Sequence, residues 1–212
     1  MLYDQNFRLK KQFYNSRKSS VNDKENRKNL VWCFAEDHRG KIWIGYQYGL
    51  IGIFDPANQH IQYIDVPEFD KRTIMAMQCD AEGNIWFGLH SGFLGKWNVM
   101  EHKFHVYKNS LAFSNEGYGI NDILINRKGE IWIATGNNGF YCFDPSKEKV
   151  TEQYTDKKGS VFDNNIATLT QINDSIIGVS TMSKGFILFN QRKKSFFPSL
   201  CKMDCRLIPF GD

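Results

Sequence analysis

Apolar and polar residues follow one another in short runs along most of the chain, and several of these runs alternate. Ile61–Ile64 and Phe104–Tyr107 alternate at period two, which is typical of half-buried β-strands. Amphipathic stripes at the 3.6-residue period of a helix do not occur. Clusters of Asp, Asn, Gly and Lys separate the runs, as turns require. The pattern predicts an all-β protein built from short strands.

Three stretches of the chain superimpose, each with a glycine three residues before a tryptophan. The pairs are Gly40 and Trp43, Gly83 and Trp86, and Gly129 and Trp132. An aromatic residue follows each tryptophan eleven residues later, at Phe54, Trp97 and Phe143. The tryptophans are 43 and 46 residues apart. A fourth copy keeps the spacing at Phe189 but has Gly178 in the tryptophan position and no turn glycine near Ser175.

Each repeat is expected to form four strands, of which the second carries the tryptophan and the third ends at the aromatic position. The expected first strands are Val31–Ala35, Ile74–Cys79, Ile120–Ile125 and Ile166–Ile172. The expected fourth strands are Ile61–Ile64, Phe104–Tyr107, Val150–Tyr154 and Ser195–Phe197. A period in the low to mid forties with four strands per unit is the signature of a β-propeller.

The tryptophans are expected to fill the space between neighbouring blades rather than to bind sugar. A four-stranded blade cannot bury both of its faces alone. At ~25 cal/mol/Å² and roughly 200 Å² of ring surface, each buried indole contributes up to about 5 kcal/mol.

The repeat also predicts how the chain divides. Tyr3-Asp4 matches Phe54-Asp55, and the run that starts at Phe7 matches a fourth strand, so residues 1–28 are expected to form a partial blade. The complete blades are expected at about 29–68, 69–110, 115–158 and 160–198, and 199–212 would begin another. We expect a segment of a larger ring, although the two ends could instead join into a fifth blade.

Composition and charge change this picture little. The chain of 212 residues is 42% hydrophobic and 15% aromatic, and its net charge of +4 is mild. Eight of the basic residues lie between 8 and 28, in a segment without interleaved stacking aromatics, which we interpret as a solvated loop. We expect no nucleic-acid partner. No apolar run approaches the ~18–20 residues that span a bilayer, and the N-terminus lacks the apolar core of a signal peptide.

The five cysteines do not indicate a metal or cofactor. Cys33, Cys79 and Cys142 lie in strand-like runs and are expected to be small buried hydrophobic residues. Cys201 and Cys205 form the only close pair, and no histidine follows at metal-ligand spacing.

The motif Asp-x-x-Gly-x-Ile-Trp-Ile-Gly, followed by Gly-hydrophobic and Phe-Asp-Pro, resembles the two-component regulator propeller repeat. It stands here as Asp37–Gly45, Gly49-Leu50 and Phe54–Pro56, and it recurs at Asp80–Gly88 and Arg127–Thr135. The resemblance covers about residues 31–190. It departs from the pattern in the fourth copy and in the loop glycine, which comes one residue early in the first two copies.

This resemblance implies the periplasmic sensor region of hybrid two-component histidine kinases of gut Bacteroidetes. There, seven-bladed propellers precede an immunoglobulin-like domain, a membrane span, the kinase and a regulator, and many such sensors bind oligosaccharides. This chain has neither a phosphoacceptor-histidine helix nor a Gly-rich nucleotide box. We therefore expect a non-catalytic module in the periplasm that binds an oligosaccharide or other small ligand and signals to downstream kinase domains.

The loops between second and third strands, and those entering the first strands, are expected to form the binding face, because they lie at one end of every blade. These loops are polar and carry two tyrosines, which could hydrogen-bond to and stack on a sugar, but turns are polar in every propeller and these could be ordinary solvated turns. The candidate ligand-binding residues are Gln47, Tyr48, Arg72, His90, Ser91, Tyr118, Asn137, Asn138, Asn164, Asn165 and Lys184.

Two other function classes stay open at this point. One is a protein-interaction scaffold, although the His and Trp-Asp signature of the tryptophan–aspartate repeat is lacking. The other is a propeller lyase resembling streptogramin lyase, for which His90 is the only suitably placed loop histidine and no carboxylate cluster accompanies it. An exposed blade edge would also favour self-association.

Overall fold

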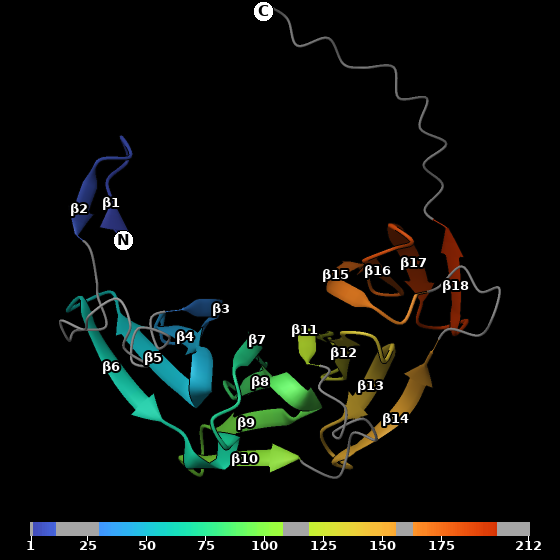
Figure 1. Ribbon diagram of the computed structural model, residues 1–212, viewed down its shortest axis with the longest axis horizontal. Coiled ribbons are helices and arrows are strands. Elements are labelled where there is room, and N and C mark those ends of the chain that lie inside the picture. Colours follow the sequence, from blue (N-terminus) through green and yellow to red (C-terminus); the bar gives the residue numbers. More distant parts are fainter. Residues whose placement is uncertain (1, 12–29, 108–118, 156–162, 199–212) are drawn as a thin grey trace, which may run out of the picture. The chain divides into compact units, whose positions relative to one another are not determined.

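The computed structural model describes residues 2–11, 30–107, 119–155 and 163–198 (Figure 1). Within these ranges the chain forms β-strands and short 3₁₀ turns but no α-helix, which confirms the all-β prediction. The strands build four antiparallel four-stranded sheets, here called blades one to four, each a meander in which consecutive strands pair. Such a sheet is the blade of a β-propeller.

Blade one consists of β3 (Val31–Glu36), β4 (Ile42–Tyr46), β5 (Leu50–Asp55) and β6 (His60–Asp65). Blade two consists of β7 (Ile74–Cys79), β8 (Ile85–Leu89), β9 (Leu94–Asn98) and β10 (Lys103–Tyr107). Blade three consists of β11 (Ile120–Ile125), β12 (Ile131–Thr135), β13 (Phe140–Asp144) and β14 (Lys149–Tyr154). Blade four consists of β15 (Ile166–Asn173), β16 (Ile176–Thr181), β17 (Phe186–Asn190) and β18 (Ser195–Pro198).

A short hairpin precedes blade one. It pairs β1 (Leu2–Tyr3) with β2 (Leu9–Lys11), and the carboxylate of Asp4 closes it by accepting the N–H groups of Asn6 and Arg8. The hairpin lies where the sequence predicts the last two strands of a partial blade. The rest of the expected partial blade, most of the basic segment, and Cys201 with Cys205 lie outside the described residues.

The chain forms two compact units, residues 1–120 and 121–212, and each is described by itself. In the first unit, the core shared by blades one and two surrounds Trp43, which is 5% exposed. The indole of Trp43 packs against Phe87 and Trp97 of blade two, with ring centroids 6.2 and 6.1 Å apart. Between these blades a tryptophan thus fills the junction, as predicted.

The connection from blade one to blade two contributes to the same core. The 3₁₀ turn η3 (Pro67–Phe69) spans the boundary that the sequence predicts between residues 68 and 69. Phe69 is fully buried, and its ring lies 5.2 Å from that of Phe87 and 5.6 Å from that of Phe104.

In the second unit, Trp132 is fully buried and has its ring 4.9 Å from Phe140 in its own blade and 5.3 Å from Phe189 in blade four. The inter-blade role of the tryptophan is therefore confirmed here too. Blade four has Gly178 in place of the tryptophan. The ring of Phe186 lies over this glycine, so close that a Cβ atom on Gly178 would be only 2.7 Å from it.

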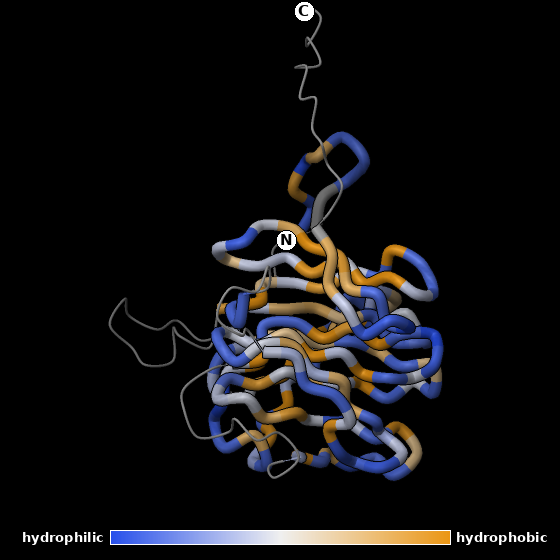
Figure 2. The backbone as a smooth tube through the Cα atoms, turned by 90° about the vertical axis from the view of Figure 1, so that its right-hand side faces the viewer, coloured by the Kyte–Doolittle hydropathy of each residue, from blue (hydrophilic) through white to orange (hydrophobic). Residues whose placement is uncertain are grey.

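Polar turns connect the strands, as the hydrophilic colour of the connections in Figure 2 shows. The hairpin between the first and second strand of each blade is closed by the side chain at position 37, 80, 126 or 173, whose Oδ1 accepts two following N–H groups. Gly40, Gly83 and Gly129 follow in the first three hairpins with φ values of 72°, 87° and 77°. That left-handed backbone costs glycine little, which explains the spacing of the repeat.

The cysteine prediction is confirmed only in part. Cys142 is buried, and burial raises the pKa of its thiol to about 12, whereas Cys33 and Cys79 are only half-buried. All three are free thiols. No helix in the described ranges is long and apolar enough to cross a membrane.

Candidate functional site

The meander places the two kinds of connection at opposite ends of each blade. The loop between second and third strands and the chain entering the first strand lie at one end, called here the loop end. The two hairpins lie at the other, the hairpin end. All described candidate residues lie at the loop end of their blades, and Tyr118 lies outside the described residues.

In the first unit, two short 3₁₀ turns build the loop end: η2 (Gln47–Gly49) and η4 (His90–Gly92). Each contains two consecutive left-handed residues. The φ values are 59° and 74° at Tyr48 and Gly49, and 68° and 76° at Ser91 and Gly92. A non-glycine residue in this conformation is uncommon and marks a tightly specified turn.

The candidate side chains of these turns are differently exposed. Tyr48 is 38% exposed and presents its ring at the surface. The Oε1 atom of Gln47 is buried and has no partner among the described residues, while the Gln47 N–H donates to the carbonyl of Leu30 at 3.3 Å. A buried carbonyl oxygen without a donor costs free energy, so this atom is suited to accept a hydrogen bond from a ligand or a water.

Arg72 is held beside the second turn. Its Nη1 donates to Oδ2 of Asp70 at 2.8 Å, and its guanidinium carbon lies 4.2 Å from the centroid of the Phe93 ring. Its Nε is buried without a partner among the described residues. Stacking and the ion pair restrict the guanidinium, which makes it a preorganised cation at the loop end.

His90 connects the turn to the start of the blade. Its main-chain N–H donates to the carbonyl of Thr73 at 2.8 Å, and its Nδ1 lies 3.2 Å from the hydroxyl oxygen of Ser91. In the part of the chain that the structure describes, no group of three or more His, Cys, Asp or Glu residues could hold a metal ion.

In the second unit, the entry to β15 links two loops. The N–H of Gly139, in the loop of blade three, donates to the carbonyl of Asn164 at 2.8 Å. The N–H of Met182, in the loop of blade four, donates to the carbonyl of Asn165 at 3.0 Å. Asn165 also forms a β-bridge with Gly136. The structure therefore brings Asn137 and Asn138 of one loop, Asn164 and Asn165 of the entry, and Lys184 of the other loop into one region.

Asp163 organises this region, although the sequence indicates it only as a loop residue. Its carboxylate accepts the N–H of Asn165 at 3.0 Å, and the N–H and hydroxyl of Ser183 at 3.0 and 2.5 Å. Burial alone would raise the pKa of the Asp163 carboxyl, but these hydrogen bonds and nearby Lys184 lower it below its ordinary value. An Asp two residues before an Asn at a strand entry could have signalled this Asx-type turn.

In the loops of blades three and four, a threonine hydroxyl makes two hydrogen bonds to the main chain, and the first two blades have no threonine in this position. The hydroxyl of Thr135 donates to the carbonyl of Gly139 at 2.7 Å and accepts the N–H of Asn138 at 3.2 Å. Thr181 makes the same two bonds, to Gly185 at 3.0 Å and from Lys184 at 2.9 Å. The four loops have the same length, since the last strand pair before each loop has the same spacing, Gly45 with Ile51 in blade one and Ala134 with Phe140 in blade three. The loop glycine therefore comes one residue earlier in the first two copies because the turn differs, not because the loop is shorter.

Comparisons with known proteins agree with this architecture. The family model described as "Two component regulator propeller" matches residues 27–48, which hold strand β3, the first hairpin and β4. The predicted resemblance to two-component regulator propeller repeats is thereby confirmed. A comparison with curated protein sequences finds no relative of the chain.

Two similar solved structures are of one protein, BT4673 from B. thetaiotaomicron. The extracellular domain of the putative hybrid two component system BT4673 is 18% identical, with a TM-score of 0.61 over 76% of this chain and 21% of that chain. A second structure of this domain, there described as a one component system, is 15% identical, with a TM-score of 0.62 over 78% of this chain and 23% of that chain. The chain spans about a fifth of the length of these structures, and the likeness shows the fold.

Proposed function

We propose that the chain is part of a ligand-sensing propeller module of a periplasmic two-component sensor, and that it has no catalytic role itself. The observation that carries the proposal is the family match within blade one, joined to four blades of the same construction. Two similar structures are extracellular domains of a two-component protein, which supports a location outside the cytoplasm.

The ligand that we propose is an oligosaccharide bound at the loop end. Each unit by itself offers groups suited to a polyhydroxylated ligand: the first has the exposed ring of Tyr48 and the stacked guanidinium of Arg72, and the second has the amides of Asn137 and Asn138. Binding would change the contacts of the module with downstream sensor and kinase domains, and so pass the signal on.

The experiment uses the chromosomal gene of the source organism. Tyr48→Ala combined with Arg72→Ala is expected to reduce transcriptional induction by one glycan at least tenfold, at unchanged protein level. Lys193→Ala, an exposed substitution at the hairpin end of blade four, is the matched control and should leave induction unchanged.

The reading frame around the coding sequence gives an independent test. The proposal expects a membrane span and a histidine kinase downstream in the same frame. Stop codons at both ends, with no sensor gene adjacent, would contradict it.

A further inference from the structure

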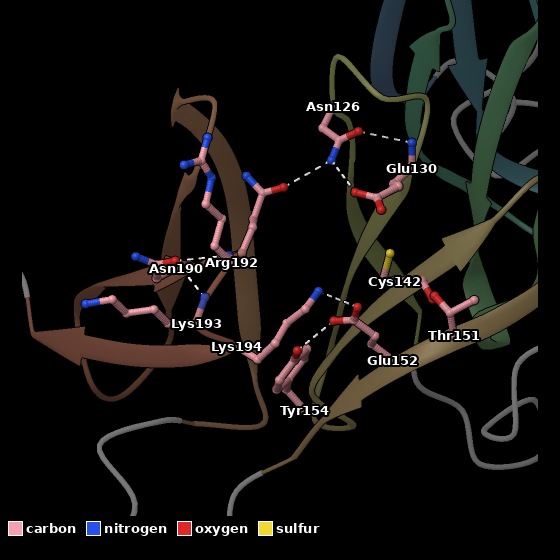
Figure 3. A network of polar contacts seen from close by, with 11 residues as sticks. Asn126, Glu130, Cys142, Thr151, Glu152, Tyr154, Asn190, Arg192, Lys193 and Lys194 are labelled. Carbon is pink, nitrogen blue, oxygen red and sulfur yellow. Dashed lines mark hydrogen bonds and ion pairs between the residues drawn. The ribbon is translucent and has the colours of Figure 1, made fainter.

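The hairpin end of the junction between blades three and four is filled by side chains of the protein itself (Figure 3). Lys194 lies with its ammonium 5.7 Å from the centroid of the Trp132 ring and forms an ion pair with Glu152. Glu152 also accepts the hydroxyl of Tyr154 at 2.6 Å. A cation over the indole and a carboxylate beside it thus occupy this junction.

The junction between blades one and two has a different residue in place of each of these charges. On the side of blade one, Gln62 pairs with Ile53 across β5 and β6, as Glu152 pairs with Cys142 across β13 and β14. The carboxylate is therefore replaced by an amide.

The cation is replaced on the side of blade two. His102 follows Trp97 by five residues, as Lys194 follows Phe189 by five. The ring of His102 packs against that of Trp97 with centroids 6.0 Å apart, so this shorter side chain turns to its own blade. Neither Gln62 nor His102 bridges the two blades.

The result is a pocket of about 430 Å³ at the hairpin end of this junction. That volume is within the ~300–1,000 Å³ of small-molecule sites. Apolar side chains from both blades lie on one part of the wall, and polar side chains of the hairpins lie on the other. The residues used below are Trp43, Trp97, His38, Gln62, Lys41 and His102.

The charged groups of the wall balance in number, because Asp37 and Glu82 are acidic and Arg39 and Lys41 are basic. The imidazole of His38 and the amide of Gln62 have no hydrogen-bond partner among the described residues. The carboxylate of Asp37 accepts two main-chain N–H groups and the indole N–H of Trp43. The ammonium of Lys41 lies 3.4 Å from the carboxylate of Asp55. A wall whose formal charges cancel, and which offers an imidazole and an amide for hydrogen bonds, favours an uncharged ligand over an ion.

We propose that this inter-blade pocket binds an uncharged ring with an apolar face and a hydroxyl-bearing edge, the chemistry of a pyranose. The apolar face lies toward the half-buried ring of Trp97, against which buried Trp43 packs at 6.1 Å, and the hydroxyl edge meets His38, Gln62 and His102. The pocket is at the opposite end of the blades from the loop end, so it is a second site, separate from that of the proposed function.

The test is ligand-observed NMR on the full chain with methyl pyranosides of glucose, galactose and mannose and with their disaccharides. The decisive variant is Gln62→Glu/His102→Lys. It introduces into this junction the acidic and basic residues that fill the junction between blades three and four, and so places an ion pair where the sugar would lie. We expect it to weaken binding at least tenfold. Tyr48→Ala, at the loop end, should change binding less than twofold, and near-UV circular dichroism should show that both variants keep the native packing.

The outcomes separate the two sites. Binding that survives Gln62→Glu/His102→Lys but is lost in Tyr48→Ala would overturn the pocket and support the loop end. Absence of binding to every sugar tested would overturn the pocket and leave the transcriptional experiment to decide the proposed function. Loss in Gln62→Glu/His102→Lys with induction unaffected by Tyr48→Ala/Arg72→Ala would support the pocket and count against the loop end.

Discussion

The indole Nε1 of Trp86 donates a hydrogen bond to Oδ2 of Asp80 at 2.8 Å. The same bond joins Trp43 to Asp37 at 3.0 Å. In both blades one carboxylate therefore has two tasks: Oδ1 closes the hairpin by accepting main-chain N–H groups, and Oδ2 satisfies the buried indole. This explains why the first two copies of the repeat place an acidic residue six positions before the tryptophan.

In blade three the corresponding side chain closes the hairpin but does not accept the indole N–H. Asn126 closes the hairpin through Oδ1, but its amide nitrogen donates to Glu130 at 2.7 Å and to Gln191 at 3.0 Å (Figure 3). An NH₂ group cannot accept the indole N–H of Trp132. That buried Nε1 has no partner among the described residues.

Asp80→Asn is expected to impose the same defect on blade two. The substitution keeps the hairpin acceptor but removes the Oδ2 atom that accepts both the indole N–H of Trp86 and the amide of Asn84, and the buried indole N–H left without its acceptor alone costs about 1–3 kcal/mol. Urea unfolding measures the loss. Asn173→Asp is the matched control, because blade four has no indole in this position; its free energy of unfolding should stay within about 0.5 kcal/mol of the wild type. Equal losses in both variants would contradict the second task of the carboxylate.

Asn126→Asp/Glu130→Asn is expected to stabilise the protein. The pair reproduces Asp80 and Asn84 of blade two, where the asparagine amide donates to the carboxylate at 2.9 Å. The indole of Trp132 gains an acceptor, worth about 1 kcal/mol in the free energy of unfolding. Asn126→Asp alone should gain less, since it places two carboxylates side by side. A double variant less stable than the wild type would refute this reasoning.

Thr135→Val should destabilise the loop of blade three. Valine has the same shape but leaves the partly buried N–H of Asn138 without its acceptor and removes the hydroxyl bond to Gly139, so we expect a loss of about 1–2 kcal/mol in chemical unfolding. Thr135→Ser keeps the hydroxyl and serves as the control, with a much smaller loss. If serine and valine are equally harmful, packing of the methyl group, rather than the hydrogen bonds, holds the loop.

Gly178→Ala should destabilise blade four in a way that depends on Phe186. The new Cβ would lie 2.7 Å from the ring of Phe186 and 2.9 Å from Cγ2 of Thr170, and overpacking of this kind costs about 1–3 kcal/mol. In the background of Phe186→Ala the same substitution should cost clearly less. A double-mutant cycle gives the coupling free energy, and strictly additive effects would show that the ring moves aside freely.

Tyr141 should make stability fall at high pH. Burial raises the pKa of its hydroxyl from 10.0 to about 12, only partly offset by the hydrogen bond from Gln153. The unfolded chain therefore loses this proton first, and stability that is complete below about pH 10 declines as the pH rises toward 12. In Tyr141→Phe the difference in free energy of unfolding between pH 9 and pH 11.5 should be smaller than in the wild type. An unchanged difference would assign the effect to other groups.

The strand pattern of the blades could be predicted from the sequence closely. The first strands of blades two and three begin and end as expected, at Ile74–Cys79 and Ile120–Ile125. Period-two alternation and a repeated turn are local properties, so a short window is enough to find them. The end of the blade at which each candidate residue lies follows from the same meander.

The pocket could not be predicted in this way. An alignment on Phe54 and Phe143 places Gln62 opposite Thr151, but the irregular register between Cys142 and Phe143 shifts the pairing so that Glu152 is the true counterpart. Such a shift is invisible in the sequence, and the volume of a junction depends on side chains from two blades. The orphaned indole of Trp132 was likewise hidden, since Asn and Asp close the hairpin equally well.

The links from the β15 entry to its two neighbouring loops run through main-chain atoms: Gly139 to Asn164 and Met182 to Asn165. Main-chain bonds are indifferent to which side chain each residue carries. Substitutions at Asn138 or Lys184 can therefore diversify the chemistry displayed here while the scaffold keeps its geometry, whereas the left-handed backbone of Asn137 (φ 83°) restricts that position. A combinatorial library at Asn138 and Lys184 should yield mostly folded proteins, which makes this end of the second unit a practical starting point for engineering new recognition.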